Sequence, residues 1–433
     1  MENENKNSLL NIPAFWMKQR QDWRITVYRT SMERLAYKMI LPYLSLFIIL
    51  LGATKTQYGY ITSAGLIVGG IMGPFIGQSI DRFGPKKVYL VGIYILIGGY
   101  LAFSCAKVWQ VAALGLFMHS VGGGISGQCC GNICGNCLEN CDRAKGMLIC
   151  ESLAAGLLGM VGPMISGWIL VNLMGVVGKP TDPNQIRPLF YVCTVIAILS
   201  LIMIYTKMSF ASVGSSHSKK KTNVIKDGIK ILKADKNCRK WVIIGAIGGM
   251  PMSLVTPYVS LFATEAKGAS AGTLALMTSA TALTSVLLGY AFGIISDKFG
   301  RKPILFVTIG LYIAGISLLL ITKNPTMLIL VGILQGFQEI GATLSASIGQ
   351  EIITDELRGR FMGITRLTTA FCSAILAALS GNIWDKIGPQ WVFIIYIVCE
   401  ICIRVPLLMS MPDTLHYEID RAKFDAIDAE LEG

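Results

Sequence analysis

Apolar residues run along this chain in stretches of about 20 or more, and short polar or basic segments separate them. A helix needs about 20 mostly apolar residues to cross a bilayer, so each stretch predicts a membrane-spanning helix. The predicted spans form two groups of six: 24–51, 57–80, 87–105, 110–138, 146–174 and 188–208, then 241–264, 272–296, 303–322, 326–352, 361–384 and 390–411. The pattern therefore predicts an all-α membrane protein with about twelve transmembrane helices in two six-helix bundles.

The segments outside the spans divide the chain into parts. We expect a cytoplasmic N-terminal segment, a first bundle, a basic linker, a second bundle and an acidic cytoplasmic tail, over residues 1–23, 24–208, 209–240, 241–411 and 412–433. The linker can hold a short amphipathic helix, and contact of its lysines with anionic lipid is an alternative to a plain cytoplasmic loop. The first 23 residues lack the pattern of a cleaved signal peptide, so the first span is expected to stay.

Composition and charge agree with a membrane protein. Hydrophobic residues make up 53% of the chain and charged residues 15%, which excludes an ordinary soluble protein. The net charge of +12 does not indicate nucleic-acid binding, because 27 of the 38 Lys and Arg lie on one predicted side and seven on the other. By the positive-inside rule, both termini are cytoplasmic. We expect a multi-pass protein of a bacterial inner membrane, with its 12 cysteines reduced.

The chain repeats itself at a fixed offset. Five residues recur 216 positions later: Gly77, Asp81, Phe83, Gly84 and Lys86 match Gly293, Asp297, Phe299, Gly300 and Lys302. In addition, residues 42–47 of the first span match residues 257–262 of the seventh at an offset of 215. Because an even number of spans separates the copies, the two halves are predicted to have the same orientation in the membrane.

The doubled G-x-x-x-D-[RK]-x-G-x-[KR] segment resembles the signature of the major facilitator superfamily. The resemblance covers about residues 24–411 and implies a secondary transporter whose signature loops hold the halves together on the cytoplasmic side. It implies gating roles for the residues of both copies: Gly77, Asp81, Arg82, Gly84, Asp297, Lys298, Gly300 and Arg301. Pro85 stands where a basic residue is usual in the first copy.

Two further segments suggest different branches of that family. Gly159, Gly162, Pro163 and Gly167 resemble the helix-five motif of drug:proton antiporters, although Gly and Pro are also common where membrane helices simply pack. The arginine that this branch usually carries in the fourth helix is missing. Residues 33–37, which begin Glu-Arg, resemble part of the motif of proton-coupled peptide transporters.

Ionisable residues inside the spans are costly, at about 2.5–3.5 kcal/mol or more each, and so mark candidate sites. Lys38 is predicted near mid-depth, and Glu33 about 7.5 Å further toward the cytoplasm. In the resembled family the first, fourth, seventh and tenth helices line one cavity. The implied substrate or proton site is Glu33, Arg34, Tyr37, Lys38, His119, Tyr258, Gln335, Gln338 and Glu339.

Several of these residues have a structural alternative. Arg29 can simply neutralise Glu33, and His119 can be a helix-packing residue. Glu151 and Arg366 hold equivalent positions and are expected to pair between the halves as a gate. Glu400 and Arg404 are expected to pair along the last helix, which faces outward in the resembled family.

Cysteines at positions 130, 134, 137 and 141 form a stripe that suggests a soft-metal site, but close helix packing is the preferred interpretation. No metal or cofactor is therefore expected.

The leading functional prediction is proton-coupled export of small organic compounds by alternating access, with Glu339 and Glu33 as proton carriers. The alternative is proton-coupled uptake of a small anionic or zwitterionic solute bound by Lys38 and Arg34. An enzyme is not expected, because the chain lacks motifs such as H-E-x-x-H, G-x-S-x-G or a phosphate-binding loop. A receptor without transport is a further alternative. The expected partners are the substrate, protons and the lipid bilayer, for a monomer.

Overall fold

The computed structural model describes residues 12–138, 146, 149–150, 155–209 and 224–412, and within these ranges it contains helices and no strand. Nine of the described helical segments are long and apolar enough to cross a membrane. The prediction of an all-α membrane protein is confirmed. α2, α3 and α5 of the first half are not among the nine spans, and α2 carries six charged residues along its length.

The described helices of the first half run in chain order as follows. They are α1 (Ile12–Lys18), α2 (Gln21–Leu50), α3 (Lys55–Phe83), α4 (Pro85–Cys105), α5 (Trp109–Cys137), α7 (Ala155–Trp168) continued by η2 (Ile169–Leu173), and α8 (Pro183–Lys207). Polar caps begin two of them: Thr54 with Gln57 at α3, and Asp182 with Gln185 at α8. Each cap satisfies backbone N–H groups that a helix start leaves without partners.

The second half begins with the helix of the linker. Its elements are α9 (Val224–Ala234), α10 (Lys236–Gly248), η3 (Pro251–Val255), α11 (Thr256–Glu265), α12 (Ala271–Phe299), α13 (Arg301–Ile321), η4 (Pro325–Met327), α14 (Leu328–Glu351), α15 (Asp355–Lys386), α16 (Pro389–Cys399), η5 (Glu400–Arg404) and α17 (Val405–Met409). The α9 helix packs on α15, where Asp227 pairs with Arg360 at 3.7 Å. The linker therefore does contain a helix.

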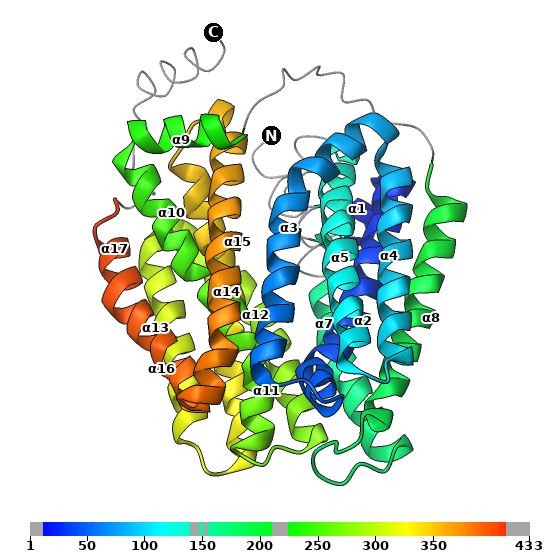
Figure 1. Cartoon of the computed structure of the whole chain (residues 1–433). Helices are drawn as coiled ribbons and strands as arrows, with labels where there is room; N and C mark the ends of the chain where they lie inside the picture. The colour runs from blue at the N-terminus through cyan, green and yellow to red at the C-terminus, as the bar shows by residue number, and fades with distance from the viewer. Residues whose placement is uncertain (1–11, 139–145, 147–148, 151–154, 210–223, 413–433) are drawn as a thin grey trace.

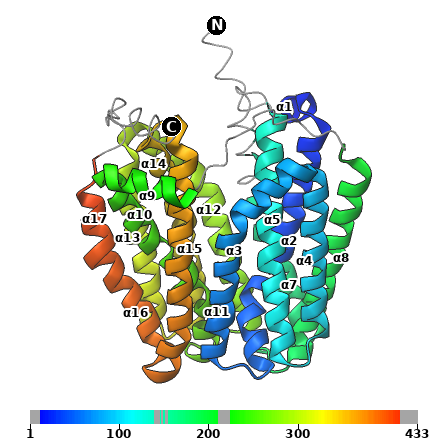
Figure 2. The same cartoon turned by 45° about the horizontal axis from the view of Figure 1, so that its top comes forward.

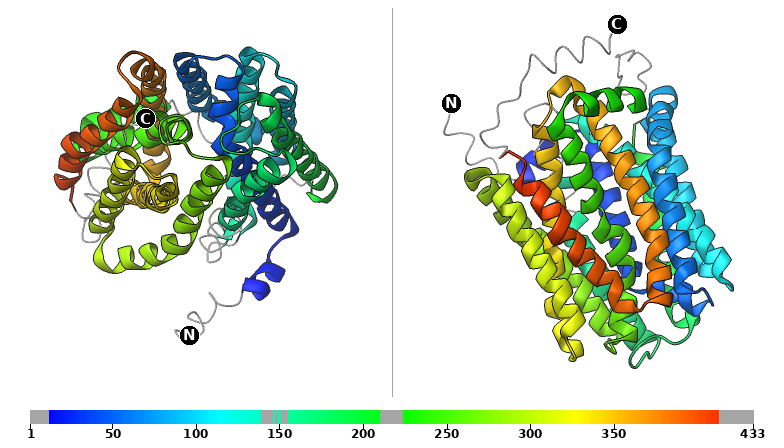
Figure 3. Two further views of the ribbon diagram at one scale, coloured as in Figure 1. Left: turned by 90° about the horizontal axis from the view of Figure 1, so that it is seen from below. Right: turned by 60° about the vertical axis from the view of Figure 1, so that its left-hand side comes forward.

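The two halves stand side by side, as Figure 1 and the left panel of Figure 3 show. We call the end of the molecule that carries α9 the linker end, and the other the opposite end; Figure 2 turns the linker end toward the viewer. The halves contact each other mainly through α3 with α15, α7 with α12, and α2 with α11. Since α2 and α14 both run the full depth of the molecule, residues midway along them lie at mid-depth.

A glycine forms the sharp turn of each signature segment at the linker end. Gly84, between α3 and α4, has φ 84° and ψ 153°, and Gly300, between α12 and α13, has φ 93° and ψ 148°. This backbone conformation is essentially restricted to glycine. The repeated glycine is therefore explained by the same turn in both halves.

The seventh predicted span is not one continuous α-helix. It consists of α10, the π-helical segment η3 and α11, and η3 begins at Pro251. Proline lacks the N–H that the preceding turn needs, so the helix widens there instead of continuing regularly. Its counterpart α2 contains Pro42 and yet remains α-helical over 30 residues.

Candidate functional site

An ion pair joins the halves at mid-depth. Lys38 Nζ of α2 donates a hydrogen bond to Glu339 Oε1 of α14 at 2.8 Å. The Lys38 side chain is 15% exposed and that of Glu339 is 41% exposed, so the pair is open on the Glu339 side. A charged pair at this depth needs a partner or water, and here each group is the partner of the other.

Glycines of α7 determine where Lys38 lies. A Cβ built on Gly162 would lie 2.6 Å from the backbone oxygen of Leu35 and 3.1 Å from the backbone nitrogen of Met39, so only glycine allows α7 to approach α2 this closely. A Cβ on Gly159 would contact the Lys38 side chain at 3.5 Å. Gly167, near the end of the same helix, packs on Ala275 of α12 in the other half. The helix-five motif thus supports α2 directly behind Lys38, with Pro163 between these contacts.

The charges of α2 on the linker side of Lys38 differ in their surroundings. Arg29 is buried, pairs with Glu33 and lies over the Tyr89 ring at 4.8 Å. Glu33 also lies next to Gly123 of α5. Arg34 is exposed and, one helical turn from Lys38, lies on the same face of α2, where its charge acts on Glu339. Arg34 is therefore a cation available to a ligand, whereas Arg29 is already neutralised.

Aromatic rings surround His119 within the first half. Its ring stacks on Tyr37 with centroids 5.0 Å apart, and its Nε2 lies 3.4 Å from Tyr100 Oη. These contacts match the helix-packing alternative for His119. Tyr37, which precedes Lys38 on α2, thus lies directly against His119 of α5.

Polar side chains continue from Glu339 along α14. Gln335, one turn toward the opposite end, has a buried Nε2 without a hydrogen-bond partner. In the other direction Thr343, Ser347 and Gln350 recur at helical spacing, and Thr343 and Gln350 are exposed. A polar stripe therefore extends from the ion pair to the linker end.

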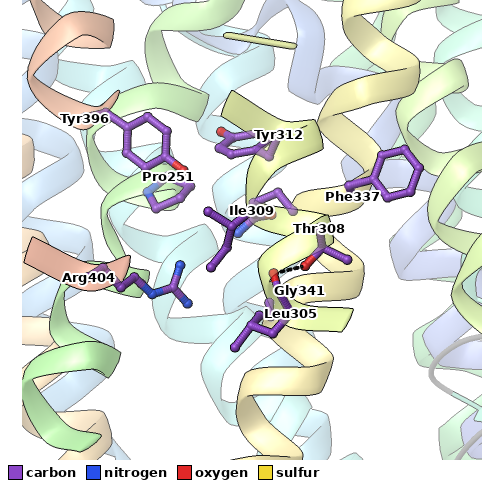
Figure 4. Close-up of a pocket in the computed structure, with 12 residues that line it drawn as sticks. Pro251, Leu305, Thr308, Ile309, Tyr312, Phe337, Gly341, Tyr396 and Arg404 are labelled. Carbon is purple, nitrogen blue, oxygen red and sulfur yellow. Dashed lines mark hydrogen bonds between the residues drawn. The ribbon is translucent and has the colours of Figure 1, made fainter. Parts of the chain in front are cut away.

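Gln338 lies elsewhere, in an internal cavity of about 30 Å³ within the second half. The cavity is also lined by Tyr312, Tyr396 and Arg404, which Figure 4 shows pointing toward one another. It has room for one or two water molecules. Arg404 bonds Glu400 Oε1 at 2.5 Å, and Glu400 is completely buried. The pairing along the last helix is as expected, but these side chains face the bundle interior, not outward.

Tyr258 is placed at the opposite end, away from the ion pair. Its hydroxyl donates to the backbone oxygen of Lys55 at 3.2 Å, and the Lys55 side chain pairs with Glu265 at 3.1 Å. Nearby, Thr56 donates to Asp385 Oδ2 through its N–H at 3.0 Å and its hydroxyl at 2.7 Å. We call these contacts between the halves the opposite-end seal.

The signature residues make no such seal at the linker end, as far as the described residues extend. Arg301 pairs with Glu351 at 2.9 Å and Asp297 at 3.8 Å, both within its own half. Arg82 lies over the Phe83 ring, and Lys298 and Arg366 are exposed. A Cβ on Gly77 would meet no described atom within 4 Å.

Two of the expected gating residues fall partly or wholly outside the described part of the chain. The side chain of Asp81 and all of Glu151 lie outside what the structure describes, so the Glu151–Arg366 gate stays a prediction. Between described residues, both ion pairs that join the halves, Lys38–Glu339 and Lys55–Glu265, lie away from the linker end.

Sequence reasoning missed the role of one repeated lysine. Lys86 Nζ donates to the backbone oxygens of Tyr205 and Met208 at the end of α8, and Lys302 Nζ does the same to Met409 and Met411 at the end of α17. Each lysine satisfies carbonyls that a helix end leaves without partners. We call these two contacts the lysine clasps; the offset of 216 was the signal that could have indicated them.

Comparison with known proteins agrees with this architecture. The Major Facilitator Superfamily model matches residues 30–270 and 241–416. An uncharacterized MFS-type transporter of Bacillus subtilis, YhcA, is 29% identical over 28% of this chain and 22% of its own length. The quinolone resistance protein NorB of Staphylococcus aureus is 29% identical over 36% of this chain and 33% of its own. The match thus spans only about a quarter to a third of these relatives.

A solved structure covers far more of the chain. The nucleoside transporter NupG, in a mutant form, superimposes with a TM-score of 0.74 at 15% identity, over 90% of this chain and 99% of that one. At this level of identity the likeness concerns the fold.

Proposed function

The chain belongs to the major facilitator superfamily and is a membrane transporter of small molecules, not an enzyme; on that premise we propose that it exports small organic compounds in exchange for protons. The observation that carries the proposal is the Lys38–Glu339 pair, which joins the two halves at mid-depth. A group that must alternate between a proton and another cation has to contact both the moving halves and water. Glu339 pairs with the other half and is 41% exposed, which supports this role.

The proposed cycle uses the charge of Glu339. When Glu339 takes up a proton, its attraction to Lys38 is lost, and the halves are released from each other at mid-depth. When the proton leaves, the carboxylate can hold either Lys38 or a cationic substrate. Competition between these three partners for one carboxylate would couple proton movement to substrate movement.

The two ends of the molecule differ in a way that supports access of the substrate from the linker end. The positive-inside distribution of Lys and Arg supports a cytoplasmic linker end in an inner membrane, with both termini on that side. The opposite-end seal then closes the outer side, and the polar stripe of α14 leads from Glu339 to the cytoplasm. A substrate would enter the site from inside in this conformation, as export requires. The name of the relative NorB, a quinolone resistance protein, is consistent with export.

Proton-coupled uptake of an anionic or zwitterionic solute is the second candidate. The observation that favours it is Arg34, an exposed cation one turn from Lys38 on the same face. Protonation of Glu339 would then free Lys38 to bind a substrate carboxylate together with Arg34.

The test is proton movement in proteoliposomes that contain the purified protein and a pH-sensitive dye. They are challenged in turn with organic cations, organic anions and small peptides, and each positive is repeated with Lys38→Ala and Glu339→Gln. Lys107→Ala, an exposed lysine at the opposite end, is the control for loss of a positive charge.

Three outcomes separate the candidates. Proton release against entering cation, lost in Glu339→Gln but kept in Lys107→Ala, supports export. Proton entry together with an anion or peptide, lost in Lys38→Ala, establishes uptake instead. Substrate flux without proton movement overturns both proposals.

A further inference from the structure

Cysteines are concentrated in one short part of the first half. Six of the 12 cysteines fall between positions 129 and 150, a stretch of 22 residues. The structure brings three of them together: the Sγ atoms of Cys130, Cys134 and Cys150 all lie within 4.8 Å of one another, and all three residues are buried. The cluster is in the linker-end half of the bundle, between α5 and the segment that holds Cys150.

The geometry points to a binding site for a thiophilic metal cation, and we propose that Cys130, Cys134 and Cys150 hold such an ion through their sulfur atoms. With a metal–sulfur distance of about 2.3 Å, ligand sulfurs lie roughly 3.8–4.0 Å apart. Cys130 Sγ and Cys150 Sγ are 3.8 Å apart. Soft ions such as Zn²⁺, Cu⁺ and Cd²⁺ prefer thiolate ligands, and a site with three of them suits these ions.

A polar side chain contacts the cluster. The Thr30 hydroxyl lies 3.4 Å from Cys130 Sγ, where it can orient the sulfur. Cys129, the chain neighbour of Cys130, is equally buried but outside the cluster.

Binding would release protons from the thiols and tie Cys150 to α5. For the stripe of Cys130, Cys134, Cys137 and Cys141, close helix packing was the preferred interpretation and no metal was expected. The proposed site takes Cys130 and Cys134 from that stripe and adds Cys150. Cys141 lies outside the described residues.

The test uses the full-length protein, purified in detergent, stripped with a chelator and reduced without added thiol. Cd²⁺ is titrated while the sulfur-to-cadmium charge-transfer absorption is followed. We expect one tight ion per chain, with affinity lowered at least about tenfold in Cys130→Ser, Cys134→Ser or Cys150→Ser. Cys129→Ser and Cys193→Ser, which remove buried cysteines elsewhere, are the matched controls.

A second measurement needs no variant. In the wild-type protein, Cd²⁺ should protect these three thiols as a group from alkylation, read residue by residue by mass spectrometry. Three results would overturn the site. They are charge-transfer absorption that persists when all three cysteines are replaced by serine, an equal loss of Cd²⁺ affinity in the two control variants, and protection from alkylation that does not include all three thiols.

Discussion

The first helices of the two halves occupy equivalent places in the repeat but are built differently. α2 is continuous over 30 residues and carries Lys38, while its counterpart is divided into α10, η3 and α11 and has Ser253 at the matching position. The position equivalent to Glu33 is Gly248. One copy supplies charge, and the other supplies a break in the helix and, through Tyr258, part of the opposite-end seal.

An arginine of another helix lies where the second copy lacks a side chain. A Cβ on Gly248 would lie 2.9 Å from Arg404 Nη2, so the guanidinium of the last helix lies where a side chain like Glu33 would begin. Among the described residues, each half thus holds an Arg–Glu pair with a buried arginine: Arg29–Glu33 on the first helix of one half and Glu400–Arg404 on the last helix of the other. Duplication preserved the packing, whereas the ionisable groups moved.

The largest expected loss of stability comes from placing a lysine in the second copy, at the position that matches Lys38. Ser253 is fully buried, and its hydroxyl donates only to backbone oxygens of its own helix. We expect Ser253→Lys to prevent folding or to lower stability by about 3 kcal/mol or more, because the new charge is buried without an acidic partner. Size-exclusion profiles and thermal unfolding in detergent measure this.

The matched control is Lys38→Ser, the reverse exchange. It should yield a folded protein that has lost coupled transport, since Glu339 remains partly exposed. A well-folded Ser253→Lys protein would show that the two copies tolerate charge equally.

A smaller loss of stability is expected when a methyl group is added at Gly248, next to the Arg404 guanidinium. In Gly248→Ala the guanidinium must move away from Glu400 or Ser345, with which it bonds at 2.5 and 3.2 Å. The expected cost is about 2 kcal/mol, visible as a lower unfolding temperature. Gly127→Ala is the control, because a Cβ there meets nothing within 4 Å, and it should leave stability unchanged or raise it. Equal unfolding temperatures for both variants would contradict this account of Arg404.

The smallest expected loss of stability, from removing a lysine clasp, should be the same in both halves. Removing a lysine clasp, by Lys86→Ala or Lys302→Ala, leaves helix-end carbonyls without their charged donor and should cost about 1 kcal/mol in each case. Thermal unfolding of the two variants compares them directly. The exposed neighbours Lys87 and Lys298 provide controls of equal charge. A loss in only one half would mean that this part of the repeat has diverged as well.

Local features of the fold were predictable because they depend on short segments. Apolar length indicated the spans, and the repeat at offset 216 indicated equivalent turns at Gly84 and Gly300. The depth of Lys38 followed from helical rise alone. Its partner Glu339 could only be inferred from family resemblance, because the two residues are 301 positions apart.

Features that depend on how helices face each other could not be predicted. Nothing in the last span shows that Arg404 turns inward to Gly248, because the contact requires the crossing of two specific helices. For the same reason Gln338 and Glu339, adjacent in the chain, face a separate cavity and the ion pair. Cys150 joins Cys130 and Cys134 through tertiary packing that periodicity along one helix does not contain.

The lysine clasps also bear on how the protein is made. Each clasp fastens the third helix of a half to the last helix of that same half. The first bundle can therefore complete its own closure once the ribosome has passed residue 208, while the second is still being synthesised. We expect the two bundles to dock in the bilayer after each has closed, so that the interface between the halves forms last.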